Sequence, residues 1–287
     1  MKIGIALSGG GIRGIAHAGV LKALEDNGIK VDIIGGTSSG SMIAMLYASG
    51  YSPYHIYRLL KKYSKDIAKV NTRPIIRNYM LNKRVTLKGL KTGNSLEEIF
   101  NKVANKQGIY NMKDIKMPLV IPAVDLMNCK EYVFTNAPPK KEDRYITDIT
   151  VGKAVRASSS FSAVFSPCEY KEHAFIDGGV LDNIPVEEVK KQGADVVNAV
   201  KFNSDEITQD SNIMDMTMKT IDIMSEKISE ENIKQANYVL NVYTDKTGLL
   251  DVEKLDSCYK YGYNAVIDNL EQIKEVIDGT NFYPSLD

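Results

Sequence analysis

The sequence predicts an α/β protein with a mainly parallel central sheet. The first observation is that short apolar runs ending in glycine clusters alternate with helix-like segments through most of the 287 residues. The second is composition: 44% of the residues are hydrophobic and 25% are charged, which is typical of a folded globular chain. This apolar content provides enough surface for a core and argues against a largely disordered protein.

The first fifty residues indicate a strand, a helix, a strand and a second helix. Residues 2–8 form a short apolar run, and residues 15–25 have helical spacing with Gly28 as the C-terminal stop. A second apolar run at 31–34 precedes a small-residue helix that ends at Ser49. Two strands joined by a helix are expected to be parallel, with a right-handed crossover.

The rest of the chain continues this alternation around one helical insertion. Residues 52–110 contain no clear strand and are predicted to form a basic helical cap or lid. We expect strands at 119–124, 131–134, 174–176, 196–202 and 238–243, and helices at 147–159, 186–192, 213–237 and 255–277.

The zero net charge of the chain conceals a strongly basic window. Residues 58–91 contain eleven Lys or Arg and one acid, Asp66, so this window carries +10 and the rest of the chain −10. Apolar side chains are interleaved with the basic ones, which predicts peripheral contact with an anionic membrane. The alternative is a solvated helix face whose charge meets acidic patches of the same protein.

Two further features indicate a cytoplasmic protein, which could then lie at the inner membrane face. The N-terminal residues lack the pattern of a signal peptide, and no apolar run reaches the ~18 residues that span a bilayer. Three cysteines lie far apart without metal-ligand spacing, which fits a reducing compartment.

A glycine-rich turn follows the first predicted strand. Its spacing, Gly9-x-Gly11-x-x-Gly14, matches the dinucleotide fingerprint, but the acid required at the end of the second strand is missing and Asp32 lies at that strand's start. A P-loop is excluded because Ile15, and not Lys, follows Gly14. The uncovered N–H groups of such a turn could stabilise an oxyanion, or the turn could be purely structural.

The second turn has the pattern of a nucleophile elbow. Gly36-Thr37-Ser38-Ser39-Gly40 fits G-x-S-x-G and lies between a strand and a helix, with Ser38 at the apex. The flanking Gly36 and Gly40 remove Cβ clashes from this sharp turn. The alternative is a plain Gly/Ser turn.

A nucleophilic serine needs a base, and Asp177 is the best candidate. The chain has three histidines: His17 is predicted to be packed and hydrogen-bonded, and His55 and His173 to be exposed. Asp177 ends a short strand and is followed by Gly178 and Gly179, so another backbone can approach it closely. A carboxylate can serve as the base of a serine if water is excluded.

Taken together, the three motifs resemble those of the patatin-like phospholipase family. The likeness extends over about residues 1–205 and includes Ala16-His17-Ala18-Gly19, Val155-Arg156-Ala157-Ser158 and the run from Phe175 to Pro185. Compact bacterial members related to the esterase domain of neuropathy target esterase are the most similar branch. One departure is the serine-rich run 158–162, where relatives usually have an Ala-rich stretch; this loop is expected to line the acyl cleft.

The resemblance implies a three-layer α/β/α patatin-like fold and a Ser–Asp dyad. Residues 1–205 would be the catalytic domain, including the basic helical cap at about 52–110, and residues 206–287 a C-terminal helical extension packing on the same domain. The implied catalytic residues are Ser38 and Asp177, and the implied oxyanion loop comprises Gly9, Gly10, Gly11, Arg13 and Gly14.

The resemblance also implies serine-dependent hydrolysis of acyl esters in phospholipids or lysophospholipids. It implies no cofactor, no metal and no nucleic-acid partner. Two alternatives remain: a catalytically weak lipid-binding or regulatory protein with the same fold, and a dinucleotide-binding oxidoreductase.

Overall fold

The computed structural model describes residues 1–68, 92–162, 164–203, 213–245, 247 and 251–279. The central feature is one mixed sheet with the strand order β5-β4-β3-β2-β1-β8-β9, to which β7 and then β6 are added beside β3. The strands are β1 (Ile3–Leu7), β2 (Ile33–Gly36), β3 (Leu119–Asp125), β4 (Lys130–Thr135), β5 (Tyr145–Ile146), β6 (Cys168–Tyr170), β7 (His173–Asp177), β8 (Val196–Phe202) and β9 (Tyr238–Val242).

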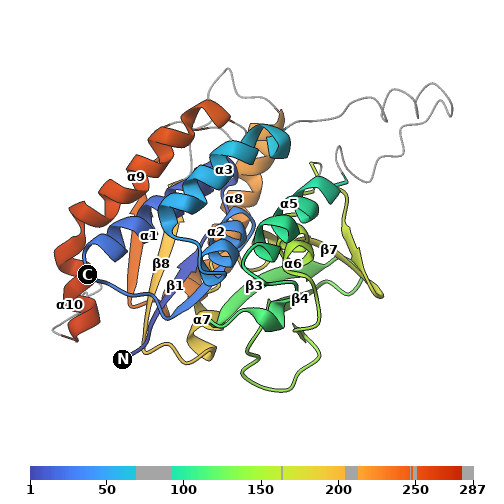
Figure 1. Cartoon of the computed structure of the whole chain (residues 1–287), viewed down its shortest axis with the longest axis horizontal. Helices are drawn as coiled ribbons and strands as arrows, with labels where there is room; N and C mark the ends of the chain where they lie inside the picture. The colour runs from blue at the N-terminus through green and yellow to red at the C-terminus, as the bar shows by residue number, and fades with distance from the viewer. Residues whose placement is uncertain (69–91, 163, 204–212, 246, 248–250, 280–287) are drawn as a thin grey trace.

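Helices cover both faces of this sheet, with α1, α3 and α9 over the near face in Figure 1. The α-helices are α1 (Ala16–Asp26), α2 (Ser39–Ala48), α3 (Pro53–Ala68), α5 (Asn94–Asn105), α6 (Val151–Ser158), α7 (Val186–Lys191), α8 (Ile213–Ile233), α9 (Leu255–Asp268) and α10 (Leu270–Asp278). Short 3₁₀ turns are η1 (Gly11–Ile15), η2 (Met112–Asp114), η3 (Gly178–Val180) and η4 (Val252–Lys254).

The alternation of side chains along β1 separates two cores. Ile5 and Leu7 belong to the larger core, which contains residues of α1, α2 and α9. Ala6 points to a smaller core formed with residues of α7. Since successive strand residues face opposite sides, this pattern requires helices on both faces and confirms the expected three-layer α/β/α arrangement.

Most strand neighbours are parallel, as expected, and the exceptions involve β3, β4, β6 and β7. β1 pairs in parallel with β2 and β8, and β9 extends the sheet beside β8. β3 and β4 form an antiparallel hairpin, and β7 runs antiparallel to β3, so that Ala123 lies opposite Asp177. This antiparallel strand brings Asp177 to the sheet edge at which β1 and β2 end.

The C-terminal segment is built into the same sheet and core. Residues 206–287 contribute β9, and α9 crosses α1 at close range. A Cβ atom on Gly19 would lie 2.0 Å from the carbonyl oxygen of Tyr259, and one on Gly262 would lie 1.9 Å from that of Ala16. The single helix expected at 255–277 is two helices, α9 and α10, which are separated at Asn269.

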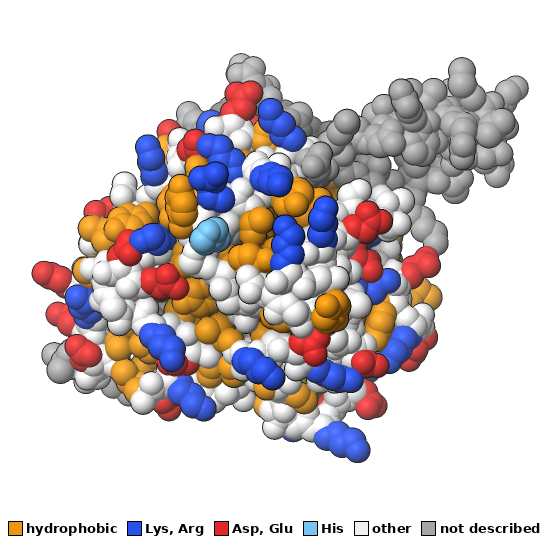
Figure 2. Space-filling model, in the orientation of Figure 1, with side chains coloured by type: hydrophobic (Ala, Val, Ile, Leu, Met, Phe, Trp, Pro, Cys, Tyr) orange, Lys and Arg blue, Asp and Glu red, His pale blue; other side chains and the backbone are white. Residues whose placement is uncertain are grey.

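The described part of the insertion at 52–110 is helical, as expected. It comprises α3 and α5, which frame a segment (69–91) outside the described residues. Most of the basic window 58–91 therefore lies outside the description. Figure 2 shows several Lys and Arg side chains on the face that carries α3. Lys61 of α3 forms an ion pair of 2.7 Å with Asp256 of α9.

Candidate active site

Ser38 occupies a strained position between β2 and α2. Its φ and ψ angles are 52° and −120°, which a non-glycine residue adopts only under constraint. The neighbouring backbone is tightly packed: a Cβ atom on Gly36 would lie 2.4 Å from the Gly40 carbonyl oxygen, and one on Gly40 would lie 2.4 Å from that of Leu7. The strand–turn–helix geometry of a nucleophile elbow is therefore present.

The serine-rich run after α6 holds the elbow in place. The Ser38 N–H donates to Ser158 Oγ at 3.1 Å, and the Ser38 carbonyl accepts from Ser159 Oγ at 3.2 Å. It also accepts from Ser41 Oγ at 2.6 Å. Ser158 and Ser159 are buried, so the elbow is fixed by contacts that water does not compete for.

Asp177 lies buried at the end of β7, beside the elbow. Its N–H donates to the Ser160 carbonyl at 3.1 Å, and its Oδ1 accepts from the Gly179 N–H at 2.8 Å. Gly178 must be small because a Cβ atom there would lie 2.4 Å from the Pro122 carbonyl oxygen and 3.0 Å from Thr37 Cγ2. This close approach brings the Asp-Gly-Gly turn against the turn that carries Ser38.

Burial controls the proton affinity of Asp177. Removal from water raises the pKa of its carboxyl to about 6, while the nearby Ser38 hydroxyl and the Gly179 N–H act in the opposite direction. Its Oδ2 is buried and makes no full hydrogen bond within the described residues, so the contact with Ser38 falls short of hydrogen-bond geometry. Such contacts often tighten only when substrate is bound.

None of the three histidines hydrogen-bonds to Ser38. His17 is fully buried, as predicted, and its Nε2 contacts the Ser8 carbonyl at 2.8 Å; burial lowers its pKa to about 4, so it is neutral. His55 is exposed, as predicted, and contacts Ser52. The prediction that His173 is exposed is wrong: it is largely buried against aromatic rings, and its Nδ1 lies 2.9 Å from Asp125.

The glycine-rich turn lies against the nucleophile. A Cβ atom on Gly9 would be 3.1 Å from the Cβ of Ser38, and one on Gly14 would be 2.4 Å from Ser39 Oγ. The Gly9 N–H donates to Asn183 Oδ1 at 3.0 Å, so it is occupied. Within the described residues, the N–H groups of Gly10 and Gly11 donate to no protein acceptor.

Arg13 fixes the peptide group between Gly10 and Gly11 in this turn. It is buried, and its Nε donates to the Gly10 carbonyl at 3.2 Å while its Nη1 donates to the Asn203 carbonyl at the same distance. The C=O and N–H of a trans peptide point in opposite directions. By holding the Gly10 carbonyl, Arg13 therefore also orients the N–H of Gly11.

Comparisons with known proteins decide the family. The sequence profile of the patatin-like phospholipase family matches residues 5–190, which includes all three turns. The chain belongs to this family. Its patatin-like region therefore covers β1 to α7.

Two curated relatives of the chain are fungal proteins much longer than it. The chain is 29% identical to lysophospholipase NTE1 of Lodderomyces elongisporus over 91% of its own length, and 33% identical to that of Scheffersomyces stipitis over 70%. It spans only 18% and 12% of the lengths of these two relatives. The likeness therefore concerns one region of each fungal protein.

A solved structure supports the fold. VipD from Legionella pneumophila aligns with 94% of this chain at a TM-score of 0.51 and 15% identity. In the described part of the chain, no helix has the length and apolarity needed to cross a membrane. Nor do three or more His, Cys, Asp or Glu side chains gather there in a way that could hold a metal ion.

The patatin-like assignment and the position of Asp32 both argue against dinucleotide binding. Asp32 accepts from the Ile3 N–H at 3.0 Å, and so lies at the beginning of β1 and β2, away from the glycine-rich turn. An acid at that edge cannot reach a ribose bound at the turn.

Sequence reasoning missed several residues that support the site. Within the run 158–162, which is predicted to line an acyl cleft, the side chains of Ser158 and Ser159 bind the backbone of Ser38, and Ser160 Oγ donates to the Arg156 carbonyl. Asn183 lies within the Phe175–Pro185 run that resembles the family, and its side chain anchors Gly9. The contacts that hold Ser38 and Gly9 join residues more than 100 positions apart, so no local pattern signals them.

Proposed function

We propose that this chain hydrolyses acyl esters of lysophospholipids or phospholipids with a Ser38–Asp177 dyad. The observation that carries the proposal is the close packing of the turn after the buried Asp177 against the turn of the strained Ser38, with no histidine in hydrogen-bond contact with either residue. The family assignment and the names of the fungal relatives support the lipid substrate class.

The proposed reaction starts with attack of Ser38 Oγ on the ester carbonyl carbon. Asp177 takes the hydroxyl proton as the new C–O bond forms, and it returns that proton to the alkoxide when the original ester bond breaks. The products of this step are an acyl-enzyme and a free alcohol. Water then attacks the acyl carbon while Asp177 accepts a proton from it. When the acyl–Ser38 bond breaks, Asp177 returns this proton to Ser38 Oγ and the fatty acid is released.

We assign the oxyanion hole to the N–H groups of Gly10 and Gly11. Both lack a protein acceptor within the described chain, and η1 begins at Gly11, so its dipole favours negative charge there. Gly9 and Gly14 would act through close packing, and Arg13 by orienting the Gly10–Gly11 peptide.

A fluorophosphonate probe tests the nucleophile. We expect covalent labelling at Ser38, and loss of both labelling and p-nitrophenyl ester turnover in Ser38→Ala. Ser39→Ala is the matched control, and it should still be labelled. Labelling at Ser39 would overturn the assignment, and a folded wild-type protein without turnover would favour the lipid-binding alternative.

We further propose that residues 58–91 contact an anionic membrane from the cytoplasmic side. The support is the +10 charge of this window and the basic surface of α3, where Arg58, Lys61 and Lys62 lie together. For Lys61 alone, the ion pair with Asp256 favours the alternative, in which acidic side chains of the same protein neutralise the basic ones.

A further inference from the structure

A polar pocket of about 340 Å³ lies beside the glycine-rich turn, apart from the dyad itself. It is lined by Ser8 and Gly9 after β1, by Lys201 and Phe202 at the end of β8, and by Asn241 and Tyr243 at the end of β9. α8 contributes Ser225, Glu226 and Ser229 from the other side. The pocket therefore lies at the carboxyl ends of parallel strands, where α/β sheets generally bind ligands.

The groups around this pocket suit an anion with several oxygen atoms. The cationic lining residues are Arg13 and Lys201, against one carboxylate, Glu226, which pairs with Lys201 at 3.2 Å. Two hydroxyls, on Ser8 and Ser229, are almost completely buried and have no hydrogen-bond partner in the described part of the chain. A buried hydroxyl without a partner costs free energy, so a ligand oxygen at this place would be stabilising.

Asn183 adds donors at the boundary between pocket and nucleophile. Its Oδ1 accepts from the Gly9 N–H, which leaves the two amide hydrogens of Nδ2 for another acceptor. Gly9 itself separates the pocket from the active site, because its Cβ position is only 3.1 Å from the Cβ of Ser38. We therefore expect the part of a substrate beyond an ester at Ser38 to reach the pocket past Gly9.

We infer that this pocket binds the phosphate-bearing glycerol head of a lysophospholipid. The inference rests on the proposed function, because it needs the ester at Ser38. In such a lipid only the glycerol carbons separate the scissile ester from the phosphate, which matches a pocket one residue away from the nucleophile. Lys201 supplies the charge, and Asn183, Ser8 and Ser229 supply hydrogen-bond donors. The pocket thereby selects phosphorylated over neutral glycerol esters.

The test compares two substrates with the same acyl chain, a lysophospholipid and a monoacylglycerol. We expect Lys201→Gln to lower the ratio of their kcat/KM values about tenfold, since a charge-assisted hydrogen bond to the phosphate is lost. Glu226→Gln should raise the ratio, because it frees Lys201 from its competing carboxylate. Lys227→Gln is the matched control: Lys227 is exposed on the same helix, pairs with Glu230 and should leave the ratio unchanged.

A binding measurement distinguishes failure of the head-group pocket from failure of the Ser38–Asp177 dyad. Calorimetry with glycerophosphate on Ser38→Ala protein should give binding that Lys201→Gln weakens, and inorganic phosphate should bind more weakly if the glycerol is also recognised. Equal binding of the two ligands would assign the site to free phosphate and overturn the head-group role. An unchanged substrate ratio in Lys201→Gln together with intact ester turnover would overturn the pocket but leave the dyad. Glycerophosphate binding without any turnover would overturn the dyad and leave the pocket.

Discussion

At the scale of single residues, the environment of Asp177 would couple catalysis by the proposed Ser38–Asp177 dyad to pH. The carboxylate must be deprotonated to accept the Ser38 proton, and burial raises its pKa to about 6. Activity therefore requires the form of Asp177 that burial disfavours. The same burial excludes water, which makes the carboxylate a better acceptor.

We expect kcat/KM for a soluble ester to rise with pH through about 6 and then level off. Folding stability should change in the opposite direction. The folded pKa lies above the ordinary value of 3.8, so this carboxyl contributes stability below pH 3.8 that is lost as the pH rises through about 6.

The variant Asp177→Asn tests both the role of Asp177 in turnover and its effect on the pH dependence of folding stability. We expect a ~10²–10⁴-fold loss of kcat, because general-base catalysis has that magnitude and no second base is in contact. Its stability should no longer change between pH 4 and 6 through this group, as chemical denaturation can measure. His173→Gln is the control, and a comparable loss of turnover in that folded variant would contradict the dyad.

Ser158 is a second residue whose role is sharply testable. Ser158→Ala leaves the half-buried Ser38 N–H without its acceptor, which costs about 1 kcal/mol of stability. Because the elbow loses one of its supports, we expect kcat to fall about tenfold with little change in KM, on the scale of a small misplacement of the nucleophile. The exposed Ser162→Ala is the matched control, and equal effects of the two variants would refute the positioning role.

At the scale of helices, the crossing of α1 and α9 depends on two glycines. Gly19→Ala would place a Cβ atom 2.0 Å from the Tyr259 carbonyl oxygen, so the helices must separate. Overpacking of this kind costs about 1–3 kcal/mol, and thermal denaturation should show the loss. Lys260→Ala, on an exposed position of α9, should leave the melting temperature nearly unchanged.

A second prediction at the scale of helices concerns membrane binding by the basic window 58–91. We expect co-sedimentation with anionic vesicles to exceed that with neutral vesicles and to weaken with salt, since each basic residue near such a surface contributes ~1 kcal/mol. Replacing both Lys83 and Arg84 by Gln should reduce it. Equal sedimentation with both vesicle types would show that the attraction is not electrostatic.

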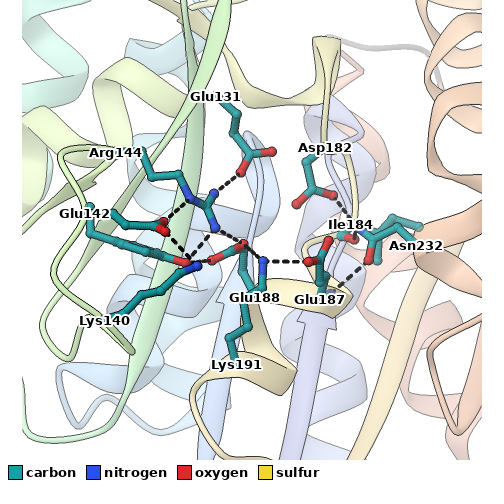
Figure 3. A network of polar contacts seen from close by, with 11 residues as sticks. Glu131, Lys140, Glu142, Arg144, Asp182, Ile184, Glu187, Glu188, Lys191 and Asn232 are labelled. Atoms are coloured by element: carbon teal, nitrogen blue, oxygen red, sulfur yellow. Dashed lines mark hydrogen bonds and ion pairs between the residues drawn. The ribbon is translucent and has the colours of Figure 1, made fainter.

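At the scale of the whole molecule, one ionic network joins the sheet edge to α7 (Figure 3). Arg144, just before β5, lies 2.6 Å from Glu188 of α7 and 3.1 Å from Glu131 of β4. Tyr145 also donates to Glu188, at 2.9 Å. Despite its burial, the pKa of Glu188 is lowered by Arg144 and Lys191, while burial and the charge of Glu188 raise that of Glu131 to about 7.

Arg144→Gln should therefore destabilise the protein strongly. It leaves the buried Glu188 with Lys191, at 2.9 Å, as its counter-charge, so the cost should approach but not exceed the about 3–5 kcal/mol of a fully unpaired buried charge. Chemical denaturation at pH 7 measures the loss, and it should shrink at low pH, where the carboxylates are protonated. The exposed Lys140→Gln removes only a surface pair and should change stability by less than about 1 kcal/mol.

The sequence by itself determined the α/β class, the elbow at Ser38 and the turn at Gly9–Gly14, and it predicted Asp177, rather than a histidine, as the base. These features are local: a strand, a turn and a helix follow one another within a few residues, and glycine is required where backbones approach closely. Only the tertiary structure decided that Ser158 and Asn183 support the site, that β3, β4 and β7 are antiparallel and that a polar pocket adjoins Gly9. Each of these depends on segments far apart in the chain, whose meeting is set by the packing of the whole sheet rather than by any pattern of neighbouring residues.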